Sequence, residues 1–413
     1  EAELEELEPK FGSVDLETHA MNLVAGGFAR TGVEIARFLS NTLTGVMHQR
    51  ALANGRKRFQ EKIATAVREG RVQLTAGGDD TLAGGVAIGG PLGAGESLLF
   101  RVSAHHHESN GFRDNAYLGR DDTNGRDEST VRGRLRWLPA DTLSVDLAVL
   151  YADVENGYDA FAIDNSLTML SDKPGKDAQQ SLGGSLRIEW SAPSWASLTS
   201  ITSAADSDID FDFDADWGND ESWAPVTYDF ISLSDRSRRT ISQEFRLASS
   251  EAGRIFGGTT DWLAGVYLLD LEDELLTINQ GEYFDPGFDF ADSLDDVFGS
   301  AYEALNIAAF GQLDAALGAA TRLSVGLRLE RRTTDYADTA GLQAGPSETM
   351  TGGDITLSHD HSGELTSFVT LSKGYKAGGF NLGIVPDDRR EFDAETLWNL
   401  EAGIKSTLLD GAM

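Results

Sequence analysis

Six aspartates occupy every second position between residues 206 and 216, and this spacing suits an ion or a charged ligand. In an extended strand alternate side chains share a face, at steps of about 7 Å. A hard cation such as calcium needs several oxygens within about 2.5 Å, which one straight row cannot supply. The pattern therefore favours an acidic wall, lumenal or extracellular, over a metal site. The row consists of Asp206, Asp208, Asp210, Asp212, Asp214 and Asp216.

Aromatic residues accompany acids in the long polar segments of the chain. Exposed rings beside carboxylates in surface loops are common material for ligand capture. We therefore predict that the six aspartates, together with Trp217, Tyr283 and Phe284, contribute to a ligand-binding surface. The ligand itself is not identified by this composition. The loop aromatics are Tyr158, Phe161, Trp217, Trp223, Tyr228, Tyr283, Phe284, Phe288 and Phe290.

A run of three histidines is a weaker candidate for metal chemistry. On a strand, His105 and His107 share one side and His106 faces the other. Two imidazoles without a third ligand make a poor site, so the run is better interpreted as the polar exit of a strand into a loop. No metal site and no cofactor are predicted.

Enzyme motifs are absent from the sequence. It contains neither G-x-S-x-G nor H-E-x-x-H, and the glycine-rich segment 89–97 lacks the lysine of a phosphate loop. A hairpin turn is the better interpretation of that segment. We predict that the protein is not an enzyme.

Composition narrows the class of protein further. The chain has 67 acids against 34 bases, a net charge of −33, which opposes nucleic-acid binding. The absence of cysteine excludes disulfide scaffolds and thiol catalysis. Glycine, at 45 of 413 residues, favours turns and strands over helical bundles.

The period of the hydrophobic pattern changes near residue 70. Residues 1–70 have apolar residues at helical spacing, and we predict a mainly helical segment there. Residues 71–413 alternate with a period of two, typical of strands. About 14 candidate strands can be counted. The clearest are 97–105, 130–139, 143–154, 186–190, 241–248, 262–271, 307–315, 323–331, 365–373 and 397–407.

The alternation places bulky apolar side chains opposite charged ones. In segment 130–139, Val131, Leu135 and Trp137 alternate with Arg132, Arg134 and Arg136. Three arginines cannot occupy a dry core unpaired, whereas a transmembrane barrel has an apolar face toward lipid and a polar face toward its lumen. We predict that Val131, Leu135, Trp137, Leu143, Val145, Leu147 and Val149 face outward.

Connection lengths favour the same architecture over a soluble sandwich or solenoid. Short turns at 92–96, 138–141 and 192–194 alternate with longer excursions. Aromatic residues near the strand ends would form interfacial girdles in a barrel, or equally an ordinary aromatic core. These are Trp137, Trp190, Trp195, Trp262, Trp398, Tyr151, Tyr267 and Tyr375. The excursions cover 108–129, 155–178, 205–235, 272–303, 336–353 and 377–396.

Six segments of residues 71–413 resemble, in order and spacing, the barrel of TonB-dependent receptors. They are SQEFRLAS (242–249), WLAGVY (262–267), AFGQL (309–313), LSVGLRLE (323–330), SKGYKAGGFN (372–381) and EFDAETLWN through GIKS (391–406). The resemblance implies an outer-membrane transporter of a Gram-negative bacterium. Its ligand would be a ferric siderophore or similar nutrient, and its partners the membrane lipid and the TonB energy-coupling complex.

The sequence also departs from that family. Residues 1–70 contain no recognisable plug or energy-coupling box, and 14 strands fall short of the family's 22. We therefore expect a barrel fragment of a longer protein, with TonB contacted through a plug outside this chain. Two alternatives remain: a passive porin, and an extracellular β-rich binding protein.

Overall fold

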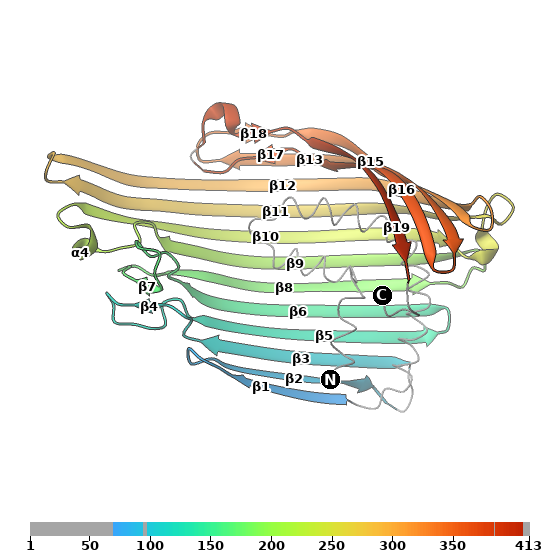
Figure 1. Ribbon diagram of the computed structural model, residues 1–413, viewed down its shortest axis with the longest axis horizontal. Coiled ribbons are helices and arrows are strands. Elements are labelled where there is room, and N and C mark those ends of the chain that lie inside the picture. The colour runs from blue at the N-terminus through green and yellow to red at the C-terminus, as the bar shows by residue number, and fades with distance from the viewer. Residues whose placement is uncertain (1–68, 94–96, 384, 408–413) are drawn as a thin grey trace.

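The protein is an all-β structure built around one curved antiparallel sheet (Figure 1). The structure, a computed structural model, describes residues 69–93, 97–383 and 385–407. The helical segment predicted for residues 1–70 lies outside these ranges, except that Glu69 and Gly70 already belong to the first strand. In the described ranges no helix is long and apolar enough to cross a membrane.

Fourteen strands follow one another across the sheet in chain order, each antiparallel to its neighbours, which confirms the predicted number and architecture. They are β1 (Glu69–Ala76), β2 (Leu82–Pro91), β3 (Leu98–Ser109), β5 (Arg126–Ala140), β6 (Leu143–Tyr158), β8 (Gly175–Trp190), β9 (Ala196–Asp214), β10 (Thr227–Ser249), β11 (Thr260–Asp285), β12 (Phe290–Ala316), β13 (Thr321–Asp338), β15 (Ser347–Ser362), β16 (Leu365–Lys376) and β19 (Glu395–Ser406).

Shorter elements occupy the connections. The strand β14 pairs with β13 at the margin of the sheet, β4 pairs with β7, and β17 pairs with β18. Their bounds, with those of the short helices, are β4 (Asp114–Asn115), β7 (Thr168–Met169), β14 (Gln343–Ala344), β17 (Gly379–Phe380), β18 (Glu391–Phe392), α4 (Asp220–Trp223), η1 (Glu251–Gly253) and η2 (Asp387–Arg389).

The four central strands are much longer than a membrane requires. A transmembrane strand needs about 9–11 residues, whereas β9, β10, β11 and β12 have 19, 23, 26 and 27. They extend beyond β5 and β6 at the end of the sheet where α4 lies (Figure 1). Segments 205–235 and 272–303 were predicted as loops, and this is wrong for most of their length. Their two-residue alternation continues, and the hydrogen-bonded ladder continues with it.

The two faces of the sheet differ as the alternation predicts. Residues directly opposite one another on paired strands point to the same side, and the register gives every strand an exposed apolar residue on one side, which we term the outer face. One such residue per strand is Val72, Val86, Val102, Val131, Leu147, Leu186, Leu198, Phe245, Val266, Ile307, Leu329, Ile355, Leu371 and Leu400.

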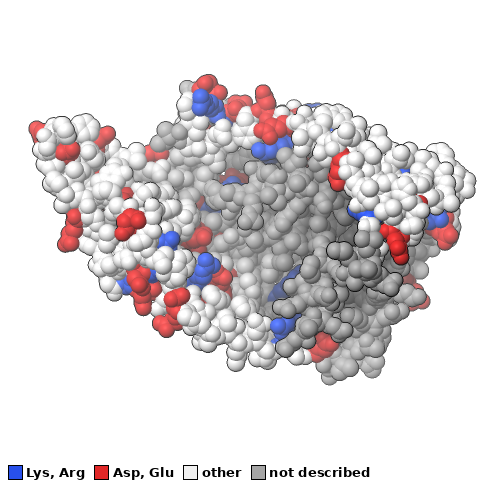
Figure 2. Space-filling model, viewed as in Figure 1, with Lys and Arg blue, Asp and Glu red and all other residues white. Residues whose placement is uncertain are grey.

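The opposite side, here the inner face, carries Arg132, Arg134 and Arg136. Polar side chains on this side are crowded: Ser181 is 2% exposed and Thr370 is fully buried. Crowding of this kind is expected on the concave side of a curved sheet, and Figure 2 shows the viewed face of the molecule hollowed. Apolar residues therefore cover the convex side and polar residues the concave side, the inversion that a membrane barrel requires.

Tryptophans lie near both ends of the outer face: Trp137, Trp190, Trp195 and Trp262 at the short-turn end, and Trp398 at the other end, where β19 begins after the long β16–β19 connection. Trp137, Trp190 and Trp398 are 48%, 44% and 64% exposed, and Trp195 stacks on Trp262 with ring centroids 6.3 Å apart. These five fit the predicted girdle. Tyr267 and Tyr375 do not.

Both tyrosines point to the inner face because polar partners hold them there. The Tyr375 hydroxyl donates to Glu330 over 2.7 Å, and the Arg328 guanidinium lies 5.3 Å from the centre of the Tyr267 ring. A phenol that finds an arginine or a carboxylate on the inner face gains a hydrogen bond or a cation–π contact there.

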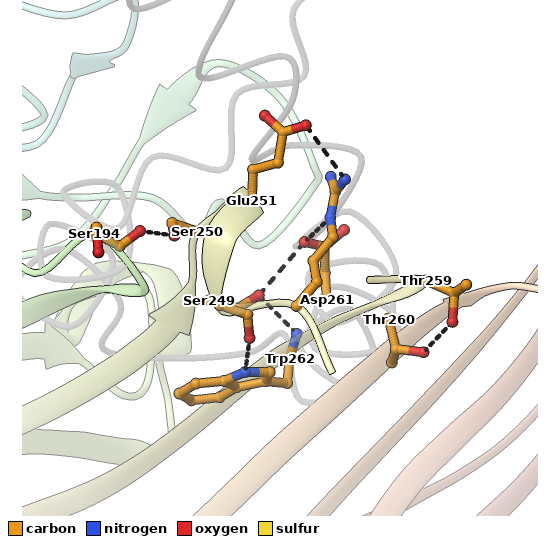
Figure 3. A network of polar contacts seen from close by, with 10 residues as sticks. Ser194, Ser249, Ser250, Glu251, Thr259, Thr260, Asp261 and Trp262 are labelled. Carbon is orange, nitrogen blue, oxygen red and sulfur yellow. Dashed lines mark hydrogen bonds and ion pairs between the residues drawn. The ribbon is translucent and has the colours of Figure 1, made fainter. Parts of the chain in front are cut away.

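The turn between β10 and β11 anchors the girdle through polar contacts (Figure 3). The Trp262 backbone N–H donates to Ser249 Oγ at 3.0 Å, and its indole N–H donates to the Gly253 carbonyl at 2.9 Å. Arg254 Nε donates to Asp261 Oδ1 at 2.9 Å. Only glycine fits at position 253, because a Cβ would lie 1.7 Å from the Trp195 carbonyl oxygen.

Within the described residues, β1 and β19 each pair on one side only. An unpaired sheet edge cannot face lipid, because its backbone N–H and C=O groups would lack partners. In a membrane these two edges therefore need further pairing.

We predict that Leu186→Arg in the full-length protein will prevent stable insertion, because a lipid-facing arginine costs about 2–4 kcal/mol near the bilayer midplane. The matched control is Ser185→Arg, one residue away on the inner face. Heat-modifiable migration on gels should be lost in the first variant and kept in the second. Equal behaviour of the two variants would contradict the assignment of faces.

Candidate ligand-binding site

The aspartate row does not form one continuous surface. Asp206 pairs across β8 with outward-facing Leu182, and the register keeps Asp208, Asp210 and Asp212 on the same outer face. The Lys176 ammonium donates to Asp210 at 2.8 Å. Asp208 and Asp210 line a shallow groove of about 420 Å³ on the outer side of the wall. The register thus places these four carboxylates on the side opposite to the inner face.

The residues that alternate with the acids along β9 lie on the inner face, and two of them, Phe211 and Phe213, are aromatic. Phe211 and Phe213 join Tyr158, at the end of β6, and Phe161, from the β6–β8 connection. The closest pair is Tyr158 and Phe211, with ring centroids 4.7 Å apart. Phe161 also stacks on Trp217, with centroids 5.3 Å apart and planes inclined by 25°. We term these five residues the first ring cluster.

A second ring cluster lies along the inner face of β10, β11 and β12. Tyr228 is central to it, with ring centroids 5.1 Å from both Trp223 and Phe230 and 6.2 Å from Tyr283. Phe290 follows Tyr283 at 6.0 Å. Of the two predicted residues here, Tyr283 belongs to the cluster.

The other predicted residue, Phe284, is on the opposite face. Phe284 directly follows Tyr283 in β11, so its side chain points to the other side of the sheet, where it is 39% exposed. Phe284 is therefore separated from the second ring cluster by the thickness of the sheet.

Asp214 and Asp216 have a different role from the rest of the row: both are buried, at 5% and 3% exposure, in the turn after β9. Asp214 Oδ1 accepts from the Asp216 and Trp217 backbone N–H groups at 3.1 Å. Asp216 accepts from the Gly218 N–H, the Trp223 indole N–H and the Phe230 N–H at 2.8–3.0 Å. These two carboxylates therefore fix the backbone that carries Trp217.

Three loops are joined to one another beside the first ring cluster. Asn219 Nδ2 donates to the Leu170 carbonyl at 2.6 Å, and the Asp172 N–H donates to the Gly218 carbonyl at 3.0 Å. From the β3–β5 loop, Asn115 Nδ2 donates to Asp159 Oδ2 at 2.8 Å. These bonds hold the loop that bears Phe161 against the turn that bears Trp217.

Several basic residues on the inner face and near its rim are paired with carboxylates. Arg236 and Arg238 both donate to Asp273, at 2.8 and 2.6 Å, and Lys173 forms an ion pair with Asp229. Pairing of this kind compensates the buried positive charges. The acids that remain in excess therefore make the local electrostatic potential negative.

His105 and His107 share one side of β3, as predicted. That side is the inner face, since both residues alternate with outward-facing Ala104 and His106. In the described ranges no group of three histidine, aspartate or glutamate side chains is arranged to hold a metal ion.

Sequence reasoning missed Phe211, Phe213 and Phe230 as site residues. The signal was present, because the row that puts aspartates on one face puts phenylalanines on the other. The ligand-binding prediction rested on the aspartates, although the phenylalanine rings lie on the inner, concave face.

No protein-family model matches the chain. Solved structures do, and three illustrate the likeness. The ferric yersiniabactin uptake receptor FyuA from Yersinia pestis is 17% identical with a TM-score of 0.65, over 83% of this chain and 52% of that one. The siderophore receptor PiuA from Acinetobacter baumannii is 11% identical with a TM-score of 0.63, over 84% and 56%. The copper transporter OprC is 15% identical with a TM-score of 0.55, over 82% and 51%.

These likenesses define the fold. The chain has the barrel fold of TonB-dependent siderophore receptors, as its six sequence segments implied. It spans about half the length of the receptors that it matches.

The Asp214 turn should respond to pH. Burial raises the pKa of the Asp214 carboxyl to about 7, and the negative charge of Asp216 beside it acts in the same direction. The pKa in the unfolded chain is about 3.9. The folded turn therefore binds the proton more tightly, so its stability is full below pH about 4 and falls as the pH rises through 7.

We predict that backbone amides of residues 214–219 exchange hydrogen about a hundredfold more readily at pH 8 than at pH 5, after correction for intrinsic rates. Asp214→Asn, which cannot ionise, should remove this dependence. Equal protection of the wild-type turn at both pH values would contradict the assignment.

Proposed function

We propose that this chain forms part of the wall of an outer-membrane receptor of a Gram-negative bacterium, which binds a ferric siderophore or a similar metal chelate and imports it. The observation that carries the proposal is the pair of ring clusters on the inner face, where the longest strands extend beyond the length of a membrane. Rings at that position meet a ligand that arrives from outside before it reaches the membrane-spanning part of the wall.

The apolar outer face supports a location in the membrane. Each of the fourteen strands exposes at least one large apolar side chain on that face. A contiguous exposed apolar surface of this extent is rare on soluble proteins and marks a partner or a membrane. The second alternative, an extracellular β-rich binding protein, would be extracted without detergent.

We further propose that import is driven by energy coupling through TonB. This proposal is supported by the fold shared with FyuA and PiuA, whose names describe uptake and reception of siderophores. An importer that moves a scarce ligand against a gradient requires an energy source, whereas a passive porin does not.

We predict that cells producing the full-length protein under iron limitation take up iron-55 siderophore, and that a protonophore stops uptake while surface binding remains. Cells without the gene serve as the control. Uptake that continues unchanged after collapse of the proton gradient would favour the porin, and absence of both binding and uptake across a panel of siderophores would contradict the proposal.

A further inference from the structure

The backbone of Trp217 is in an unusual conformation. Its φ of +62° lies in the left-handed region, where bulky residues other than glycine are rare and strained. Such strain persists only where the surroundings impose it, and it concentrates at functional sites. Here the surroundings are the buried carboxylates of Asp214 and Asp216, which accept four backbone N–H groups and one indole N–H within the turn and from β10.

This strained turn presents a ring to solvent. Trp217 is 41% exposed, although its neighbours Asp216 and Asn219 are 3% and 4% exposed. Phe161, its stacking partner, is also 41% exposed. Phe161 covers one face of the indole, so the exposed surface of Trp217 remains for a further ring. Exposure of apolar rings is unfavourable in water, and a stacked ligand would relieve it.

The charge of the segments around these rings restricts the net charge of the ligand. Segments 205–235 and 272–303 contain ten acids each and no lysine or arginine. Lys173, in the β6–β8 connection, and Lys176, in β8, are paired with Asp229 and Asp210. A polyanion would meet a repulsive field here, whereas a neutral or cationic ligand would not.

Resting on the proposed function, we propose that Trp217 and Phe161 form an aromatic platform that stacks on an aryl group of a metal chelate with zero or positive net charge. Asp214 and Asp216 are positioning residues for the platform, since they act on the ligand only through Trp217.

Three iron complexes distinguish the effect of an aryl ring on binding from the effect of net charge. Tris(benzohydroxamato)iron(III) and tris(acetohydroxamato)iron(III) are both neutral and share the same ligating atoms, and only the first carries aryl groups. Tris(catecholato)iron(III) carries aryl groups and three negative charges. Dissociation constants are measured by equilibrium dialysis of the iron-55 complexes against the full-length protein in detergent.

The wild-type protein should bind the benzohydroxamate complex most tightly of the three. Trp217→Ala should weaken that binding about two- to tenfold, the range expected for an aromatic pair, and leave the acetohydroxamate complex unaffected. Trp217→Phe keeps a ring and should retain most of the preference. Asp216→Asn should lose the preference for the aryl complex, because the ring is no longer held in place.

The matched control is Phe288→Ala. Phe288 is an exposed aromatic, 85% exposed, at the tip of the β11–β12 hairpin, and its loss should change none of the three constants. Heat-modifiable migration verifies that each variant is folded.

Equal affinity of the wild-type protein for the two neutral complexes would overturn the platform, as would an unchanged preference in Trp217→Ala. Tightest binding of the trianionic complex would overturn the selection by charge. Should none of the complexes bind while energy-dependent siderophore uptake is intact, the platform is overturned and the proposed function stands.

Discussion

Backbone hydrogen bonding is the constraint on which the rest of this structure depends. Lipid offers no partner to an N–H or C=O group, so a chain that crosses a membrane as strands must pair every strand with its neighbours. Pairing fixes the register, and the register fixes which side chains share a face. The fourteen paired strands therefore separate apolar from polar residues across one thin wall. Val131 and Arg132, adjacent in sequence, consequently face different solvents.

The same constraint builds the candidate site beyond the membrane. β9 to β12 continue as a hydrogen-bonded ladder beyond the length that a membrane requires, and their side chains still alternate between the two faces there. There it separates acids from rings: Asp212 faces outward while Phe211 and Phe213 face inward. The ladder ends at a turn in which Asp214 and Asp216, unlike the four aspartates before them, are buried. Their carboxylates accept hydrogen bonds from the turn and hold Trp217 in place.

Much of this could be predicted from the sequence because a two-residue period is a direct record of strand faces. The strand number, the opposition of Arg134 to Leu135, and the tryptophan girdle all follow from it. The loop prediction for 272–303 was wrong because acidic composition was weighed above alternation. The conformation of Trp217 could not be predicted, since it depends on hydrogen bonds from Phe230 and Trp223, which only the fold brings to Asp216. The helical prediction for residues 1–70 lies outside the described residues.

The central claim is that one face of this wall meets lipid and the other an aqueous lumen, and the absence of native cysteine permits a direct test. Single cysteines placed along β6 at Val145, Asp146, Leu147, Ala148 and Val149 would carry nitroxide spin labels in the full-length protein in bilayers. Collision with oxygen reports lipid, and collision with a water-soluble nickel chelate reports water. We expect oxygen contact at the odd positions and nickel contact at the even ones. Uniform accessibility along the strand, or the reverse alternation, would contradict it.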